Sequence, residues 1–316
     1  MIAHAASARL PSGQPGRAVG RTRASRERRL GYALVAPVVL LLLAVTAYPL
    51  AYNLWNSFHS VNLSVAESAQ PFVGVDNYTK MFTSKEWVSA LERTAAFTAV
   101  SIFIETIVAV ALALMLHRSF RGRGLLRAAI LVPWAVPTVV SATLWKTMFD
   151  PRAGFVDYML GGVGLPGAHT TWLAGIWTSW AAVLVADAWK NVPFMAIILL
   201  AGLQVIPGEI YEAARIDGAT AWQTFRRMTL PLLKPALAVA LIFRTLQAFL
   251  VFDVIYIMTG GGPGVSTETL SFLNWQTFLV GTDFGYGGAI SVMLVVMSLA
   301  IAAVYVRLLR PETGAT

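Results

Sequence analysis

The chain has 316 residues, of which 57% are hydrophobic and only 13% are charged. A soluble domain carries about 25% charged residues, so this composition excludes an ordinary water-soluble fold. Yet the net charge is +8, from 24 Lys and Arg against 16 Asp and Glu. Excess positive charge on an apolar chain is typical of an inner-membrane protein with its basic residues on the cytoplasmic side. A nucleic-acid-binding surface, the rival explanation, needs a soluble basic face, and the sequence indicates no soluble domain.

The chain contains no cysteine, which excludes disulfides, thiolate metal sites and cysteine nucleophiles. Its four histidines are scattered without the HxxxH or HExxH spacing of a metal site, so we expect no bound metal. A membrane-embedded enzyme would need clustered acids or His/Ser dyads at one depth, and the sequence indicates none. We therefore expect no catalytic residues.

Residues 1–29 are rich in Arg, Ala and Gly, which predicts a disordered basic tail. Six apolar stretches follow, and a helix needs about 20 such residues to cross the hydrocarbon layer. They lie near residues 32–55, 91–116, 128–149, 178–205, 231–258 and 287–308. The first is longer than the apolar region of a cleaved signal peptide, so we expect it to be retained. The sequence predicts an all-α integral membrane domain of six helices over residues 30–310, with a short tail at 311–316.

The positive charges are unevenly distributed over the connections between these stretches. Seventeen of the 24 Lys and Arg lie in the N-terminal tail, in the second and fourth connections, or at the C-terminus. Only four lie in the opposite connections or at their edges. Because basic residues are retained on the cytoplasmic side, this asymmetry predicts that both termini are cytoplasmic.

The connection between the fourth and fifth stretches is patterned like two short helices. Residues 209–216 are a run of helix formers that ends near Gly218, and glycine tolerates the left-handed conformation after a helix. Thr220 is placed to cap a second helix at 221–228, and Pro231 then opens the fifth span. From the pattern alone this segment is either an amphipathic hairpin on the membrane surface or a docking element for another protein.

Specific residues of this connection resemble a known motif. They are Glu212, Ala213, Ala214, Asp217, Gly218, Ala219, Phe225, Leu230 and Pro231. The set is similar to the EAA motif of permease subunits of ATP-binding-cassette (ABC) importers, and we call residues 207–230 the coupling loop. Residues 72–78 (FVGVDNY), 230–235 (LPLLKP) and 252–263 resemble the carbohydrate-importer branch. The resemblance covers nearly the whole chain after residue 30 and is greatest to the maltose-type first permease, in particular the actinobacterial trehalose-importer permease.

The resemblance implies the type I fold of ABC importer permeases and a subunit that moves a sugar across the bacterial cytoplasmic membrane by alternating access. In this family the coupling loop inserts a helix into a cleft on the ATPase subunit. The implied partners are a second similar permease, two ATP-binding subunits, an extracytoplasmic sugar-binding (lipo)protein, the sugar and the lipid bilayer, with no nucleic acid. The chain would then be a transport subunit and not an enzyme.

ATP and Mg²⁺ are expected in the partner ATPase, with no cofactor bound by this chain directly. A P-loop needs a Gly-Lys pair, and the sequence has none. The Gly-rich run at 260–264 lacks the lysine and the following helix of a P-loop, so we expect a flexible outer turn there.

Polar residues inside the spans are the candidates for substrate contact, because such groups are costly in a membrane. The candidates for the substrate pathway are Asn191, Phe194, Gln247, Lys190, Phe243, Arg244 and Asp253. The resemblance places the sugar site of the family on these two helices. These charged residues can instead have a structural role and not contact the substrate. Glu105 can pair with Arg244 across the bundle, and Asp187 can neutralise Lys190 on the same helix.

Other transporters remain as alternatives. Glycerol-phosphate importers share these motifs, and Arg244 or Lys190 can meet a phosphate. An ion-coupled secondary transporter predicts internal repeats and intramembrane acids as ion sites, but it leaves the coupling loop unexplained. The sequence does not identify the sugar, nor whether this subunit or its partner permease holds the sugar site.

Overall fold

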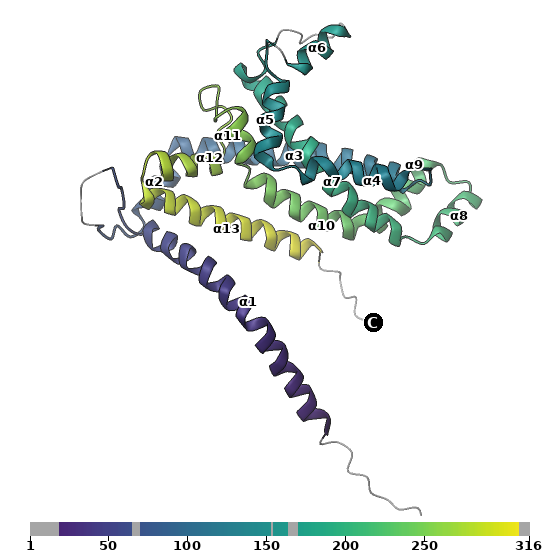
Figure 1. Ribbon diagram of the computed structural model, residues 1–316, viewed down its shortest axis with the longest axis horizontal. Coiled ribbons are helices and arrows are strands. Elements are labelled where there is room, and N and C mark those ends of the chain that lie inside the picture. Colours follow the sequence, from purple (N-terminus) through teal and green to yellow (C-terminus); the bar gives the residue numbers. More distant parts are fainter. Residues whose placement is uncertain (1–18, 65–69, 153, 164–169, 310–316) are drawn as a thin grey trace, which may run out of the picture. The chain divides into compact units, whose positions relative to one another are not determined.

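The protein is described by a computed structural model that covers residues 19–64, 70–152, 154–163 and 170–309 (Figure 1). Within these ranges the chain is built from helices, and extended segments pair only as isolated bridges, between His59 and Phe72 and between Asn62 and Asp283. The chain divides into two units, Met1–Tyr52 and Asn53–Thr316.

The first unit holds most of α1 (Val19–Ser57), which begins inside the predicted tail. Its part from Arg28 to Ser57 is long and apolar enough to cross a membrane, in agreement with the first predicted span. Residues 1–18 of the predicted tail at 1–29, and the predicted C-terminal tail at 311–316, lie outside the described residues.

The second unit holds the remaining helices. The long ones are α3 (Lys85–His117), α7 (Ile176–Val205), α10 (Leu230–Phe249) and α13 (Phe284–Leu309), together with the successive helices α4 (Arg123–Ala135) and α5 (Thr138–Met148). The short ones are α2 (Asp76–Thr83), α6 (Phe155–Gly162), η1 (Trp172–Ala174), α8 (Gly208–Ile216), α9 (Ala221–Thr224), η2 (Phe225–Thr229), α11 (Asp253–Met258), α12 (Leu270–Trp275) and η3 (Gln276–Val280). α7 packs against α3, α4 and α10, and α10 also packs against α13.

Among the described residues, five helices are long and apolar enough to span a membrane, or six if α4 and α5 count as one span. The predicted third span at 128–149 is therefore not one straight helix, because α4 and α5 meet at 92°. Pro137 explains the break, since proline disfavours helical geometry in the residue before it. Val136 is accordingly extended, with φ −71° and ψ 133°. We call Val136 and Pro137 the elbow.

The predicted fifth span, 231–258, also differs from the structure. α10 ends at Phe249, and α11 starts only at Asp253. At its other end, the helical segment is continuous from Ala221 to Phe249, so the second predicted loop helix runs directly into the span. Pro231 cannot donate a backbone hydrogen bond into the turn before it, which favours the wider π-helical geometry of η2 there.

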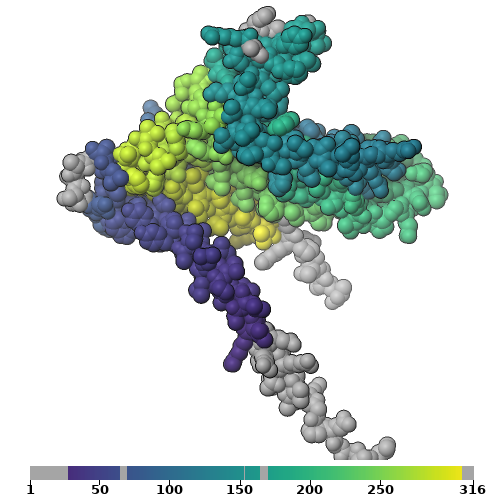
Figure 2. All heavy atoms as spheres, viewed as in Figure 1, coloured from purple at the N-terminus to yellow at the C-terminus, as the bar shows by residue number. Residues whose placement is uncertain are grey.

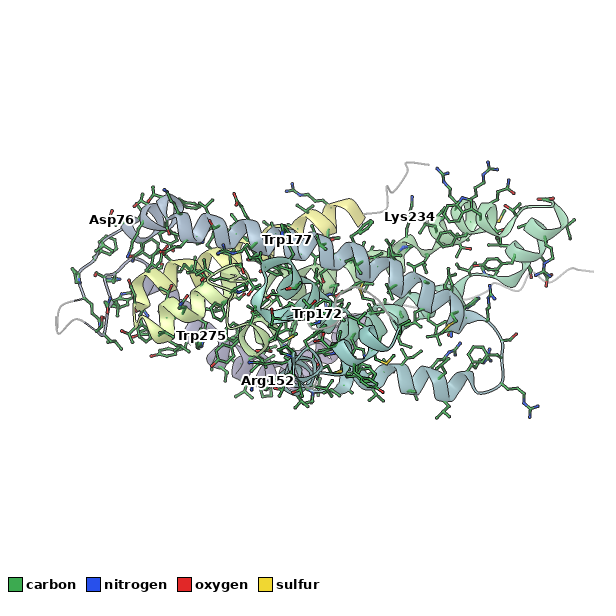
Figure 3. All side chains as sticks on the ribbon, turned by 90° about the horizontal axis from the view of Figure 1, so that it is seen from above. Asp76, Arg152, Trp172, Trp177, Lys234 and Trp275 are labelled. Carbon is green, nitrogen blue, oxygen red and sulfur yellow. The ribbon has the colours of Figure 1, made fainter. Side chains whose placement is uncertain are left out.

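The two ends of the second unit separate the segments that the charge pattern assigns to opposite sides of the membrane. α2 and α12 lie towards one end, whereas α8 and α9 lie at the other (Figure 1). In Figure 3, Asp76, at the start of α2, lies near the first of these ends, and Lys234, near the start of α10, lies towards the second. α5 and α6 extend away from the long helices (Figure 2).

The Gly-rich segment at 260–264, where a flexible turn is expected, leads into a loop that accepts hydrogen bonds from two long helices. The indole N–H of Trp180 donates to the carbonyl of Ser266 at 3.1 Å, and Arg93 Nε donates to the carbonyl of Glu268 at 2.7 Å. Thr267 and Thr269 are fully buried. The loop is fixed because two long helices, α3 and α7, supply donors to its backbone.

Candidate functional site

The first helix of the coupling loop forms as the sequence predicts. α8 covers Gly208–Ile216 and is followed by Gly218 in the left-handed conformation, with φ +71°. The backbone N–H of Ala219 donates to the carbonyl of Ala214 at 2.9 Å and so satisfies a carbonyl that the helix end leaves free. Gly218 is needed because a side chain is strained at this φ.

The second helix starts at the predicted cap. The N–H of Gln223 donates to the hydroxyl of Thr220 at 3.3 Å, and the N–H of Thr220 donates to the amide oxygen of Gln223 at 2.8 Å. This reciprocal pair is a capping box. It fixes the direction in which the chain leaves the turn and enters the continuous segment that becomes α10.

The predicted coupling residues divide into exposed and packed groups. Those exposed are Glu212, Ala213, Asp217, Gly218 and Pro231, those half-buried are Ala219, Phe225 and Leu230, and Ala214 is buried. Two apolar side chains that the sequence analysis missed, Ile216 and Trp222, flank the turn and are 86% and 66% exposed. Their position next to Asp217 and Gly218 was the available signal. Exposed apolar groups at the end of the bundle mark a surface for another protein or for the membrane interface.

A group of buried charged residues joins three long helices at the centre of the second unit. The guanidinium of Arg244 on α10 contacts both carboxylate oxygens of Glu105 on α3, with Nη2 to Oε1 at 2.9 Å. It also binds the carboxylate of Asp187 on α7 and the hydroxyl of Ser101, the latter at 2.8 Å. The side chains of Arg244 and Glu105 are 3% and 0% exposed. The predicted pairing of Glu105 with Arg244 is confirmed, and we call these four residues the charge cluster.

Lys190 has different partners from those expected. Asp187 is paired with Arg244 and accepts a hydrogen bond from Asn191 Nδ2 at 2.9 Å, whereas the Nζ of Lys190 donates to the carbonyls of Trp134 and Val136. The alternative in which Asp187 pairs directly with Lys190 is thus not the arrangement in the structure. The break at the elbow leaves the last carbonyls of α4 without helical partners, and an ammonium group satisfies them.

Aromatic side chains from three helices meet beside Lys190. The ring of Phe194 on α7 stacks on Trp134 of α4, with centroids 4.9 Å apart and planes at 9°. The rings of Phe194 and of Phe243 on α10 are nearly perpendicular, with centroids 6.4 Å apart. Phe243 is 53% exposed, and Gln247, one turn along α10, is also exposed. We call Trp134, Phe194, Phe243 and Gln247 the aromatic strip.

The seven predicted substrate-pathway residues therefore fall into three groups. Lys190, Asn191 and Arg244 are held by other protein groups. Phe194, Phe243 and Gln247 belong to the aromatic strip, and Asp253 is exposed at the start of α11. Sequence reasoning missed Ser101 and Trp134. Trp134 lies between Pro133 and Pro137, a spacing that already indicated an interrupted helix.

Apolar spans, a broken helix and buried charges at the centre of the bundle define a membrane transport protein. The chain belongs to the family described as the binding-protein-dependent transport system inner membrane component, which it matches over residues 105–310. The coupling loop and the aromatic strip both lie inside the matched region.

The chain is similar over most of its length to several sugar transport proteins. It is 41% identical to the trehalose/maltose transport system permease protein MalF of Thermococcus litoralis, over 89% of this chain and 94% of the relative. It is 40% identical to the trehalose transport system permease protein SugA of Mycobacterium tuberculosis, over 89% of each chain. It is 37% identical to the sulfoquinovosyl glycerol transport system permease protein SmoG of Agrobacterium fabrum, over 90% of this chain and 92% of the relative.

Solved structures show the same fold. The chain matches a crystal structure of a bacterial ABC transporter involved in the import of the acidic polysaccharide alginate, with a TM-score of 0.78 and 25% identity over 93% of this chain and 99% of that chain. A second structure of an alginate ABC transporter, in complex with an alginate pentasaccharide-bound periplasmic protein, matches with the same TM-score at 23% identity, over 93% and 98% of the two chains. The fold is that of an ABC importer permease, and the chain is a transport subunit and not an enzyme.

Proposed function

We propose that the chain is one permease subunit of an ATP-driven importer of a neutral disaccharide such as trehalose or another α-glucoside. One observation supports the choice of a neutral sugar: beside the elbow the cationic groups are bound within the protein, whereas uncharged groups are exposed. The two cations of this region, Arg244 and Lys190, are bound by protein oxygens. The exposed groups of the aromatic strip are rings and an amide, which suit the faces and hydroxyls of a sugar. This arrangement favours a neutral sugar over a glycerol phosphate, whose phosphate needs a free cation.

The two relatives at 41% and 40% identity are named for trehalose transport, which supports the choice of sugar. An ion-coupled secondary transporter is the weaker proposal. The acids of the charge cluster, which such a transporter would use as ion sites, are occupied by Arg244.

The energy for transport comes from a partner ATPase, which holds ATP and Mg²⁺. The coupling loop is the proposed contact with that ATPase. Its exposed Ile216 and Trp222 supply apolar contact area. Two exposed carboxylates are close to them in the sequence: Asp217 lies between Ile216 and Trp222, and Glu212 lies one turn before Ile216. ATP binding would draw two ATPase subunits together, and two coupling loops would transmit this motion to the helices. The bundle then alternates between inward and outward states, which requires that ATP binding favours one of the two.

The remaining proposed partners are a second, similar permease and an extracytoplasmic sugar-binding protein. The end of the bundle that holds α2 and α12 is the proposed face for the binding protein. Basic residues at the opposite end support a cytoplasmic placement of the coupling loop. The charge asymmetry along the sequence favours both termini on the same side of the bacterial cytoplasmic membrane.

The proposal is tested by reconstituting the permease pair, the ATPase and the binding protein in proteoliposomes. We expect uptake of labelled trehalose that requires ATP inside the vesicles. Uptake driven by a proton gradient without ATP would overturn the proposal.

The docking role of the coupling loop has a separate test. Ile216→Ser and Trp222→Ser should reduce co-purification of the ATPase, and Glu212→Ala should lower uptake more than ATP hydrolysis. The exposed Val205→Ser, on α7 before the loop, is the matched control for loss of an exposed apolar side chain. Wild-type uptake and co-purification in all three loop variants would contradict the docking role.

A further inference from the structure

The connection between α3 and α4 is strongly cationic. Arg118, Arg121 and Arg123 lie within six residues of one another, and all three are exposed. Residues 106–149, which include this connection, contain no Asp or Glu. The side chains of the three arginines form no hydrogen bond or ion pair with any residue that the structure describes. Their positive charge is therefore available to a partner.

The backbone of this connection is held in a fixed turn. Gly122 adopts the left-handed conformation, with φ +87°, and α4 starts at the next residue. The guanidinium of Arg127 on α4 donates from Nη2 to the carbonyl of Leu116, near the end of α3, at 2.9 Å. Because the two helix ends are tied together, the backbone of the turn loses little conformational freedom when a ligand binds.

Apolar side chains are exposed among the arginines. Phe120 is 40% exposed, and Leu125, in the first turn of α4, is 80% exposed. A surface that mixes basic and apolar side chains in this way suits the boundary between lipid headgroups and acyl chains. We use the name basic turn for the set Arg118, Phe120, Arg121, Arg123 and Leu125.

The basic turn joins two membrane helices at the end of the second unit that the charge pattern assigns to the cytoplasm. α3 is a candidate span up to His117, and α4 is the first half of the bent span. Only residues 118–122 separate these helices, whereas α8 of the longer coupling loop lies farther out at the same end (Figure 1). So short a connection keeps the basic turn at the membrane surface, at the level of the phospholipid headgroups.

Charge complementarity separates the two candidate occupants of this surface, the ATPase and the lipid. The coupling loop, which is the proposed contact with the ATPase, contains three acids and three arginines and has no net charge. The basic turn instead has three positive charges and no acid. α4 also begins without an acidic residue in its first turn, where a helix favours a negative charge. A surface of one sign beside the bilayer suits an anionic headgroup, whose phosphate oxygens guanidinium groups bind in pairs.

We propose that the basic turn binds an anionic phospholipid of the cytoplasmic leaflet. The three arginines bind the phosphate group, and Phe120 and Leu125 lie against the acyl chains next to the headgroup. The bound lipid anchors the joined ends of α3 and α4 to the membrane surface. This site is separate from the sugar pathway and does not depend on which sugar the importer carries.

The test measures lipid binding at the turn itself in the complete importer in detergent micelles. This chain has no cysteine, so a fluorophore can be attached at one position through Ser119→Cys, an exposed site within the turn. Reactive cysteines of the other subunits are replaced beforehand. The probes are phosphatidylglycerol, which is anionic, and phosphatidylcholine, which is zwitterionic, each with a nitroxide quencher on the acyl chain near the headgroup. With the turn otherwise unchanged, phosphatidylglycerol should half-quench the fluorophore at a mole fraction at least about tenfold lower than phosphatidylcholine.

The arginine variants test the headgroup contact. Arg121→Gln should raise the half-quenching mole fraction of phosphatidylglycerol about fivefold, the contribution of one basic residue near an anionic surface. In the triple variant of the basic turn both lipids should quench equally; its changes are Arg118→Gln, Arg121→Gln and Arg123→Gln. The matched control removes three exposed arginines elsewhere that the charge pattern also assigns to the cytoplasmic side, and it should keep the preference; its changes are Arg28→Gln, Arg29→Gln and Arg307→Gln.

Leu125→Ser tests the apolar contact. It should weaken quenching by both lipids and leave the ratio between them unchanged, because the acyl chains of the two lipids are the same. The yield of assembled complex should stay at the wild-type value in all variants, since every substituted side chain is exposed.

Four outcomes would overturn the proposal. Equal quenching by the two lipids with all arginines present shows that the turn has no headgroup preference. A loss of preference in the control triple as large as in the basic-turn triple assigns the effect to overall charge. Displacement of phosphatidylglycerol by free inorganic phosphate makes a soluble anion the ligand. If the basic-turn triple lowers co-purification of the ATPase and keeps the lipid preference, the turn is a contact with the ATPase. No sugar enters the assay, so none of these outcomes bears on the proposed sugar transport.

Discussion

Arg244 on α10 and Glu105 on α3 form a two-point ion pair at the centre of the helix bundle, although 139 residues separate them in the sequence. Asp187 on α7 binds the same guanidinium, and Ser101 donates to the Glu105 carboxylate at 2.9 Å. One buried cation is thus shared by two carboxylates from two other helices. The arrangement fixes the register of α3, α7 and α10 against one another, because a shift of one helix would leave a buried charge unpaired.

Arg244→Met should be the most damaging change in the charge cluster. It leaves two buried carboxylates without a cation, and loss of one partner of a buried pair costs about 3–5 kcal/mol. Glu105→Gln should cost less, since Arg244 keeps Asp187 and the amide still accepts a hydrogen bond. The measurement is the temperature at which purified complex loses its monodisperse chromatographic peak. Equal temperatures for Arg244→Met and wild type would contradict the structural role of the cluster.

Sequence reasoning was most successful where local patterns determine the structure. The apolar stretches, the left-handed Gly218 and the Thr220 cap depend on neighbouring residues, and the structure contains all three. The pairing of Glu105 with Arg244 was also predictable, because few residues at that depth can neutralise each other.

The errors arose from long-range contacts. The sequence left open a pairing of Lys190 with Asp187, three residues away on the same helix, but in the structure Asp187 pairs with Arg244 from α10. Lys190 then binds carbonyls that exist as free acceptors only because the third span is broken. Likewise, nothing in the Gly-rich run at 260–264 indicates that Ser266 and Glu268, just after it, accept hydrogen bonds from α7 and α3. No local pattern contains these partners.

Gly202→Ala should destabilise the contact between α7 and α10. A Cβ on Gly202 would overlap the Cβ of Ala236 and lie 3.0 Å from Cδ1 of Leu233, so the two helices must separate. Overpacking of this kind costs about 1–3 kcal/mol. Gly124→Ala is the matched control, because a Cβ there meets nothing within 4 Å. Thermal stability of the purified complex should fall for Gly202→Ala only, and equal losses in both variants would argue against close helix contact at Gly202.

Glu268 should make stability depend on pH. Burial raises the pKa of this carboxyl above its ordinary value of 4.5, Arg93 opposes the shift, and Glu86 adds to it. The folded protein therefore holds this proton more tightly than the unfolded chain, so the contribution is complete at low pH and is lost as pH rises from 4.5 through the folded pKa. Glu268→Gln keeps the shape without titrating and should flatten this part of the profile. The unfolding temperatures of wild type and Glu268→Gln, measured from pH 4.5 to neutral, should converge at the acidic end. Parallel profiles for wild type and the variant would contradict the prediction.

Gly218→Ala should impair coupling through the backbone alone. A Cβ at Gly218 meets nothing within 4 Å, but φ is +71°, a conformation that costs a residue with a side chain about 1 kcal/mol. The variant relieves this strain by changing the turn between α8 and α9, which moves Ile216 relative to Trp222. Gly208→Ala makes the same chemical change in the same loop, also meets nothing within 4 Å, and has no positive φ. The ratio of trehalose taken up to ATP hydrolysed in proteoliposomes should fall for Gly218→Ala and remain at the wild-type value for Gly208→Ala. A fall of equal size in both variants would assign the effect to the added methyl group and not to the left-handed turn.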